Sequence, residues 1–220
     1  MSSADPAPPP AHGGERFAYD SNEFGRGITF FDAIYAFSAT LLITNLDAPA
    51  EEDWRSVSAL LDSGLGAQLL GFTISFVVIT LFWRVNVGIL RQLSALNRPV
   101  IIANLVAAGL VILIPFTTGG ISIDDVGDYP LPTALYALNI ALASLAQTAI
   151  YLTAHHHRVL ADGADRLPAH LLASLVPPAV FLISIPVAYA AGPAAGQWTW
   201  LSLVVLVPLS GRLLSPTRTA

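Results

Sequence analysis

Six long apolar stretches, separated by shorter polar segments, run along this chain of 220 residues. Each stretch is close to the roughly 20 residues that an α-helix needs to cross a hydrocarbon core about 30 Å thick. Prolines inside the later stretches fit membrane helices, because neighbouring helices in a bundle satisfy the carbonyl groups that a proline leaves free. The pattern predicts an all-α integral membrane protein with a six-helix bundle in each subunit. The predicted helices cover residues 28–46, 67–90, 100–118, 132–154, 171–191 and 194–214.

The two ends of the chain do not follow this pattern. Residues 1–23 are rich in proline, alanine and glycine, and they lack the charged-then-apolar order of a signal peptide. Such a composition predicts a disordered N-terminal tail. We therefore expect one membrane domain over residues 24–215 and a short cytoplasmic tail over residues 216–220.

Composition supports a membrane location. Hydrophobic residues make up 54% of the chain and charged residues only 11%, and the mean hydropathy is +0.64. An ordinary soluble domain has roughly a quarter of charged residues. The last four stretches also show no polar face at helical spacing, which disfavours a soluble helical bundle. The absence of cysteine excludes disulfides and thiolate metal sites.

The charges alternate between the two sides of the predicted bundle. The segments after the first and third stretches are acidic, at residues 51–53 and 124–128, whereas those after the second and fourth carry arginine. Cationic residues concentrate on the cytoplasmic side, so both termini of this multi-pass protein of the cell membrane are expected in the cytoplasm. The acidic segments would either concentrate cations at an outer mouth or simply be solvated loops. The arginines assigned to the cytoplasmic side are Arg16, Arg26, Arg84, Arg91, Arg98, Arg158, Arg166, Arg212 and Arg218.

The first stretch is the most polar of the six. It contains Asp32 and several hydroxyl side chains, and Arg26 lies just before it. An ionisable residue in a membrane helix usually faces protein or water and marks a pathway or a contact between helices. Six positions separate Arg26 from Asp32, so the two do not share a helix face, and Asp32 is expected to find its partner on another helix. The alternative is that Arg26 extends to the headgroups and Asp32 caps the first turn.

Four segments carry a recognisable pattern. They are RGITFFD (residues 26–32) followed by AIYAFSATLLITNLDAP, then SFVVITLFWRVN, then Asn104 with residues 114–117, and last ALYALNIALASL. Together they resemble the first four helices of the transmembrane-protein-175 family of potassium channels, whose first helix carries the signature RxxxFSD. The resemblance covers about residues 24–155. Two positions depart from the family pattern, because Phe31 replaces the serine of the motif and Asn86 stands where the family often has histidine.

The resemblance implies a homotetramer in which four copies of the first helix surround a central pore. The chain lacks the TVGYG loop of ordinary potassium channels, so selection must come from side chains. A narrow apolar ring gates by dewetting, and it favours potassium modestly because potassium sheds its water more easily than sodium. Four phenylalanines at the constriction would either close the pore more tightly or offer ring faces to the cation. The implied pore and gate residues are Phe37, Thr40, Leu41 and Thr44.

The same resemblance implies a polar network that holds the first helix to the second and third. A buried carboxylate needs a partner, which an arginine, a tryptophan N–H or an asparagine amide would supply to Asp32. The expected function is a potassium-preferring cation channel without a cofactor, whose partners are the lipid bilayer, permeant monovalent cations and its own copies, and no nucleic acid. The network residues are Arg26, Phe30, Asp32, Trp83, Asn86 and Asn104.

Other features suggest less chemistry. Three adjacent histidines, at residues 155–157, point about 100° apart on a helix and share one metal ion poorly, so we predict a helix end and no metal site. Trp198 and Trp200, with Gln197, are expected to anchor the outer interface, as is Tyr129. No hydrolase, nucleotide-binding or zinc-peptidase motif appears, so no enzyme activity is predicted. A secondary transporter, which would need matching broken helices, and a non-conducting membrane scaffold remain as alternatives.

Overall fold

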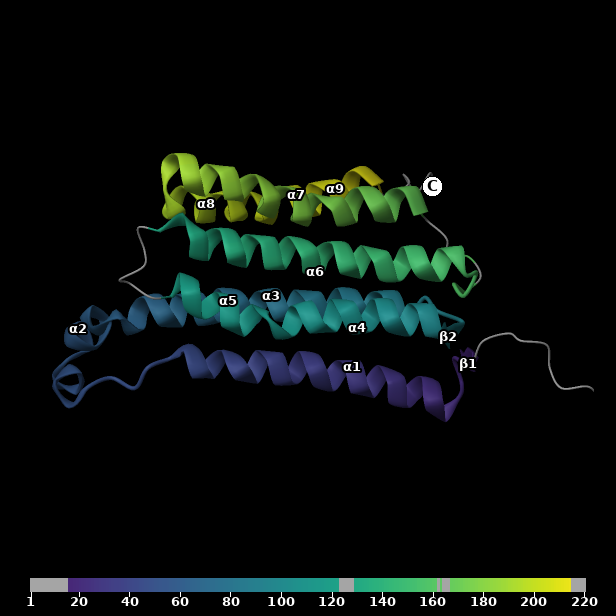
Figure 1. Ribbon diagram of the computed structural model, residues 1–220, viewed down its shortest axis with the longest axis horizontal. Coiled ribbons are helices and arrows are strands. Elements are labelled where there is room, and N and C mark those ends of the chain that lie inside the picture. The colour runs from purple at the N-terminus through teal and green to yellow at the C-terminus, as the bar shows by residue number, and fades with distance from the viewer. Residues whose placement is uncertain (1–15, 123–128, 162, 164–166, 215–220) are drawn as a thin grey trace, which may run out of the picture.

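The computed structural model describes residues 16–122, 129–161, 163 and 167–214 of the chain. Over these residues the chain is a bundle of antiparallel helices with a small two-stranded sheet at one end (Figure 1). The predictions for residues 1–15, for the acidic segment at residues 124–128, for Arg166 and for the tail after residue 214 lie outside the described residues.

The predicted helices are present with small shifts at their ends. Five helical segments within the described residues are long and apolar enough to cross a membrane, which agrees with the first five predicted stretches. The sixth stretch is helical but is divided into three consecutive pieces that pack against the fifth. The membrane helices are α1 (Asn22–Leu41) with η1 (Leu42–Asn45), α3 (Gly66–Leu90), α4 (Arg98–Ile112) with α5 (Ile114–Ile121), α6 (Pro130–His156), α7 (Leu167–Ala191), and α8 (Pro193–Thr199) with η5 (Trp200–Ser202) and α9 (Leu203–Leu214).

The helices lie in successive layers. In Figure 1, α1 forms one edge of the bundle, α3, α4 and α5 come next, α6 lies in the middle, and α7, α8 and α9 form the opposite edge. The most buried span is α6, whereas only 22% of the apolar window is buried within the subunit in the span of α1, and the same share in the span that ends with α3. One whole side of α1 is therefore left uncovered by its own chain.

A break divides the third membrane span. The helix α4 ends at Ile112 and α5 begins at Ile114, with Pro115 in its first turn. Proline has no N–H to donate and clashes with the preceding turn, so the helix is interrupted at this point. The internal proline is thus accommodated within a membrane span, and the carbonyl oxygen of Pro115 accepts a hydrogen bond from Asn45 of η1 (2.8 Å).

The ordered chain begins earlier than the composition predicts. Strand β1 (Arg16–Ala18) pairs antiparallel with β2 (Ala95–Asn97), and Ser21 caps α1 by accepting from the Phe24 N–H (3.1 Å). The prediction of a disordered tail is therefore wrong for residues 16–23. The reason is that backbone pairing with a distant loop, which composition does not reveal, supplies the hydrogen bonds that order this segment.

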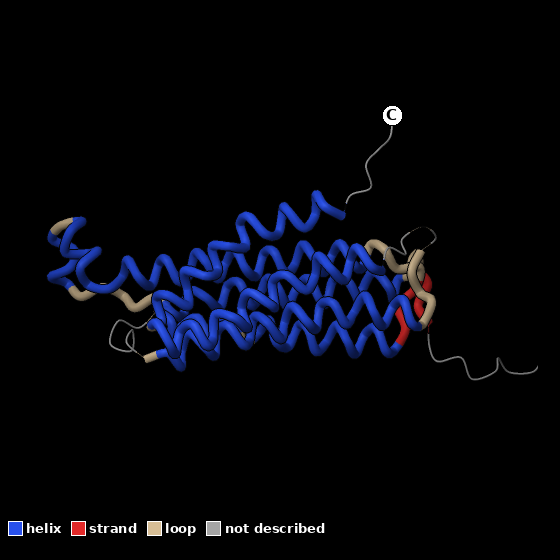
Figure 2. The backbone as a smooth tube through the Cα atoms, turned by 90° about the horizontal axis from the view of Figure 1, so that it is seen from above, coloured by secondary structure: helices blue, strands red, loops and turns tan. Residues whose placement is uncertain are grey.

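At the opposite end, a short overhang links α1 to α3. It consists of η2 (Glu51–Arg55), α2 (Val57–Leu60) and η3 (Leu61–Leu65), and it extends past the ends of the other helices (Figure 2). Gly64 adopts φ = +84°, a backbone conformation that glycine reaches without strain, and this allows the chain to turn into α3. Gln68 donates to Asp47 (3.0 Å) and thereby joins the start of α3 to the segment between η1 and the overhang.

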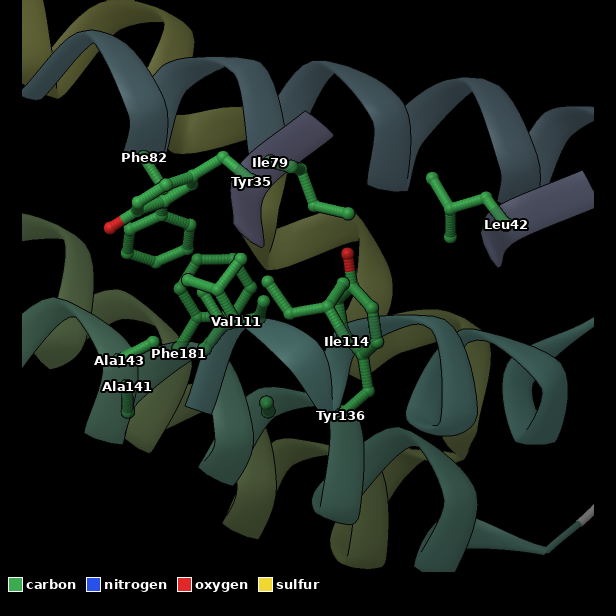
Figure 3. Packing of buried hydrophobic residues seen from close by; sticks show 12 residues of the cluster. Tyr35, Leu42, Ile79, Phe82, Val111, Ile114, Tyr136, Ala141, Ala143 and Phe181 are labelled. Atoms are coloured by element: carbon green, nitrogen blue, oxygen red, sulfur yellow. The ribbon is translucent and has the colours of Figure 1, made fainter. Parts of the chain in front are cut away.

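Two clusters of buried side chains form the core. One, near the sheet, includes Phe24, and the partly buried Phe17 of β1 packs against it. The other joins all the layers, from Tyr35 on α1 to Phe181 on α7 (Figure 3).

Trp200 belongs to this second cluster, so its predicted role as an outer-interface anchor is wrong. Its ring lies 5.1 Å from that of Tyr136 and 5.4 Å from that of Phe181, and its Nε1–H donates to Ser184 (3.0 Å). An indole in the core needs a hydrogen-bond acceptor, and the hydroxyl on α7 provides it. Trp198, in contrast, is 70% exposed.

Close packing of α8 against α7 depends on Gly196. A Cβ atom at this position would lie 2.7 Å from the Cβ of Ala188 and 3.0 Å from the carbonyl oxygen of Ser184. We predict that Gly196→Ala lowers the stability of the protein by about 1–3 kcal/mol through overpacking. The measurement is the thermal unfolding midpoint in detergent.

The matched control is Gly109→Ala in α4, where a Cβ would meet no atom within 4 Å. This control should leave stability unchanged or raise it by up to about 1 kcal/mol, the helix-propensity difference between the two residues. Equal midpoints for the two variants would contradict the proposed close contact.

Candidate functional site

The uncovered side of α1 carries one continuous line of side chains. Phe37 is 62% exposed and Phe30 is 55% exposed, and Arg26, Thr40 and Thr44 are exposed as well. Steps of three, four and seven residues return to nearly the same helix face. Phe37 and the threonines therefore share a face, as predicted, and Leu41 lies at its half-buried margin.

A second exposed line runs beside the first. Thr29, Ala36 and Ile43 follow each other at seven-residue intervals and are all exposed. The opposite face of α1 is buried against the bundle through Phe24, Phe31, Tyr35, Ser38 and Leu42. About half of the helix circumference is thus available for contacts outside the subunit.

The hydroxyl groups on the exposed face have a defined orientation. Thr40 Oγ1 donates to the carbonyl oxygen of Phe37 (2.8 Å), and Thr44 Oγ1 donates to that of Leu41 (2.7 Å). Each hydrogen is used within the helix, whereas the lone pairs of each hydroxyl oxygen stay available. The face therefore presents two oxygen acceptors next to a large apolar ring, a combination that suits a partly dehydrated cation.

Asp32 finds its partner on α3. The Nε1–H of Trp83 donates to Asp32 Oδ1 (2.8 Å), and this pair lies near the surface, with Trp83 40% exposed. Arg26 is exposed and makes no hydrogen bond or ion pair with any residue that the structure describes. Phe30 contacts its neighbour Phe31 edge-on (5.7 Å) and otherwise points away from the bundle. The structure thus places Arg26 and Phe30 on the exposed face with Phe37, away from the other predicted network residues.

Asn86 and Asn104 form a separate, fully buried pair between α3 and α4. Asn86 Nδ2 donates to Asn104 Oδ1 (2.9 Å), and both side chains have 0% exposure. Asn86 Oδ1 and Asn104 Nδ2 have no partner among the described residues. The six residues expected to form one network therefore contribute two distinct pairs, one at the surface and one in the core.

Three polar contacts that sequence reasoning missed join the helices in the core. Gln147 on α6 donates to the Tyr35 hydroxyl (2.7 Å) and to the Phe82 carbonyl oxygen (3.2 Å). Thr118 donates to Ser75 (2.7 Å), whose hydroxyl also contacts that of Tyr136 (3.2 Å). The third contact is the hydrogen bond from Asn45 to Pro115. The available signal was simple: each is a polar residue inside an otherwise apolar stretch, which implies a partner on another helix.

The histidines at residues 155–157 lie where a helix end was predicted. The helix α6 ends at His156, and His157 is its C-cap residue. The rings of His156 and His157 meet edge-on with their centres 5.0 Å apart. Within the described part of the chain, no three histidine or carboxylate side chains are grouped to share a metal ion.

Comparison with known proteins shows what this chain is similar to. The family model described as "Endosomal/lysosomal potassium channel TMEM175" matches residues 26–115, from the start of the exposed line on α1 to the break at Pro115. Over residues 26–115, the chain is similar to the TMEM175 family. The match to TMEM175 confirms the resemblance found in the sequence, and because this is a family of ion channels, it also agrees with the prediction that the chain is not an enzyme.

Two individual proteins are also similar to this chain. A potassium channel from Chryseobacterium sp. (strain P1-3) is 23% identical over 124 residues, which are 56% of this chain and 61% of that protein's length. The crystal structure of a lysosomal potassium-selective channel TMEM175 homolog from Chamaesiphon minutus superposes with a TM-score of 0.68 at 17% identity. It covers 86% of this chain and 99% of the other, which confirms the six-helix fold.

The buried asparagine pair gives a test of the core of this fold. Asn104→Leu leaves the amide of Asn86 buried without a partner, and such a loss costs about 1–3 kcal/mol of stability. We expect the double variant Asn86→Leu/Asn104→Leu to be closer to the unmodified protein than either single variant, because both polar groups are then removed together. Unfolding in detergent measures this. Additive losses in the double variant would show that the two amides do not depend on each other.

Proposed function

We propose that this protein is a potassium-preferring cation channel whose pore is lined by α1 of each subunit in a homotetramer. The observation that carries the proposal is the exposed line on α1, the helix at one edge of the subunit (Figure 1), where Phe37 is followed by the hydroxyls of Thr40 and Thr44. The relatives named above are potassium channels, and the sequence match to their family includes the whole of this line.

The two exposed lines on α1 favour a central position for this helix. A helix next to a symmetry axis needs one face toward the axis and an adjacent face toward the neighbouring copy. The line through Phe37 and Thr44 suits the axis, because it offers an apolar ring and hydroxyl oxygens. The line through Ala36 and Ile43 is apolar and includes a small side chain, as contacts between membrane helices prefer.

Phe37 supplies the constriction in this proposal. Four bulky rings at one level of a pore exclude water, so the barrier for a hydrated ion is high. Potassium holds its water less strongly than sodium and therefore crosses with a lower penalty. The oxygens of Thr40 and Thr44, one and two turns away, replace part of the lost hydration.

Charge gives the orientation. Arg91, Arg98 and Arg158 lie at the end of the bundle that holds β1 and β2, whereas residues 51–53 of the overhang are acidic. By the distribution of cationic residues, we assign the sheet end to the cytoplasm and the overhang to the outside. The acidic overhang then concentrates cations near the outer mouth.

The decisive experiment uses the purified full chain in liposomes with a potassium gradient. A channel produces electrogenic potassium flux larger than that for sodium. Obligatory exchange at a fixed stoichiometry would instead assign a secondary transporter, and an absence of flux from correctly assembled protein would assign a scaffold.

The role of Phe37 gives a specific prediction. Isoleucine is smaller than phenylalanine, so Phe37→Ile leaves a wider opening at the constriction. We expect the single-channel current to rise at least about twofold, which corresponds to a barrier lower by roughly 0.4 kcal/mol. The control is Tyr189→Ile on α7, where the side chain is 58% exposed and the helix lies at the edge of the bundle opposite α1 (Figure 1). An unchanged or smaller current in Phe37→Ile would contradict a constriction at this residue.

A further inference from the structure

The stretch of α1 proposed to line the pore lies between two hydrogen bonds to other helices. Before it, the Tyr35 hydroxyl accepts from Gln147 Nε2 (2.7 Å). After it, Asn45 Nδ2 donates to the Pro115 carbonyl oxygen (2.8 Å). Phe37, Thr40 and Thr44 lie between these two bonds. The hydroxyls of the two threonines donate only to carbonyl oxygens of α1. Between these two bonds, the stretch is held to the bundle by packing alone, as at the buried Leu42.

Gln147 holds three helices at once. It lies on α6 and is 3% exposed, and the same amide nitrogen that reaches Tyr35 also donates to the carbonyl oxygen of Phe82 on α3 (3.2 Å). A carbonyl oxygen only accepts hydrogen bonds, so this second contact fixes which end of the amide faces α1 and α3. The nitrogen of Gln147 is thus held at the place where it meets the Tyr35 hydroxyl.

The Tyr35 side chain sets which way the opposite face of α1 points. Successive residues on a helix are about 100° apart, so Tyr35 and Phe37 project about 200° apart. Tyr35 is 2% exposed and lies in the central cluster with Phe82, whereas Phe37 is exposed (Figure 3). A rotation that draws Tyr35 away from Gln147 must turn Phe37 by the same angle.

Apolar packing alone opposes such a rotation only weakly in a membrane. Lipid chains are as apolar as leucine, so exchanging lipid contacts for protein contacts provides little hydrophobic driving force, and packing and hydrogen bonds between helices decide the arrangement. The Asp32–Trp83 bond also restrains α1, but it is partly exposed and lies one turn farther from Phe37. The Tyr35–Gln147 bond is buried and is the restraint nearest to the constriction.

We propose that Gln147 is a positioning residue: from α6, outside the pore lining, its bond to Tyr35 sets the rotation of α1 and thereby the conductance and the potassium preference of the channel. This inference rests on the proposed pore function and assigns part of its selectivity to a helix that does not line the pore. Gln147 acts through Tyr35 and does not touch the permeating ion.

The test compares three variants in liposomes and in single-channel recordings: Tyr35→Phe, Gln147→Leu and the double variant. One hydrogen bond between membrane helices is worth a factor of about three in the equilibrium between two arrangements of the helix, so each single variant should change the potassium-to-sodium permeability ratio by up to about threefold. The double variant should change it no further, because both substitutions remove the same bond. The control is Ser144→Ala, also buried on α6, whose hydroxyl bonds only to Ile140 of the same helix (2.9 Å); it should behave as the unmodified protein.

A second measurement does not depend on conduction. The chain has no cysteine, so Ala33→Cys and Leu41→Cys each introduce a single thiol. These positions lie about 40° to either side of Phe37 on the helix, so when the bond between Gln147 and Tyr35 is removed, a rotation changes their rates of modification by a small methanethiosulfonate in opposite directions. General loosening would raise both rates, and that result would overturn the proposal.

The outcomes distinguish a failure of the proposed channel function from a failure of the role of Gln147. Absence of potassium flux in the unmodified protein would overturn the proposed function. The rates of thiol modification would still decide whether the bond between Gln147 and Tyr35 sets the rotation of α1. An unchanged permeability ratio and conductance in Tyr35→Phe, which deletes only the hydroxyl, would overturn the role of Gln147 while leaving the channel function intact. If Gln147→Leu does not assemble, Tyr35→Phe alone gives the answer.

Discussion

The structure depends on a constraint that the bilayer imposes: its interior offers no hydrogen-bond partner, so each polar group there must find one within the protein. Helices satisfy the backbone. The few polar side chains are then free to act as specific links, and most of those in the core join two or three helices, as do Gln147 and Ser75. In a surrounding medium that rewards apolar packing only weakly, these links decide how the helices are rotated and which faces remain uncovered.

One face of α1 has no packing partner within its own subunit. A lone membrane protein would be expected to turn its most polar helix inward, yet here the helix with the signature motif lies on an edge and exposes Phe37 and its hydroxyl groups. The part of the chain that matches the TMEM175 family model, residues 26–115, contains this helix and the two spans that hold it. The later helices α6 and α7 cover the other side of these two spans, and Gln147 of α6 reaches through to Tyr35 on α1.

The sequence predicted what depends on local composition and left out what depends on distant pairing. The membrane helices followed from apolar length. The family resemblance pointed to one network of six residues, and the structure joins four of them in two separate pairs, Asp32 with Trp83 and Asn86 with Asn104. The strand at residues 16–18 was missed because its partner lies far along the chain, and composition alone suggested a tail. Trp200 was misplaced for a similar reason, since its acceptor Ser184 becomes a neighbour only after α7 and α8 fold back on each other.

The short sheet has a mechanical consequence for α1. Only Tyr19, Asp20 and Ser21 separate β1 from the first turn of the helix, and the Tyr19 N–H bonds to Ser94 (3.0 Å) in the turn before β2. That turn is itself joined to the end of α6 through Ser94 and Val159 (2.8 Å). Because this connection is so short, α1 cannot move along the membrane normal unless the hydrogen bonds between β1 and β2 break or the two attached loops move with it. Twisting and bending are the movements that this attachment leaves open.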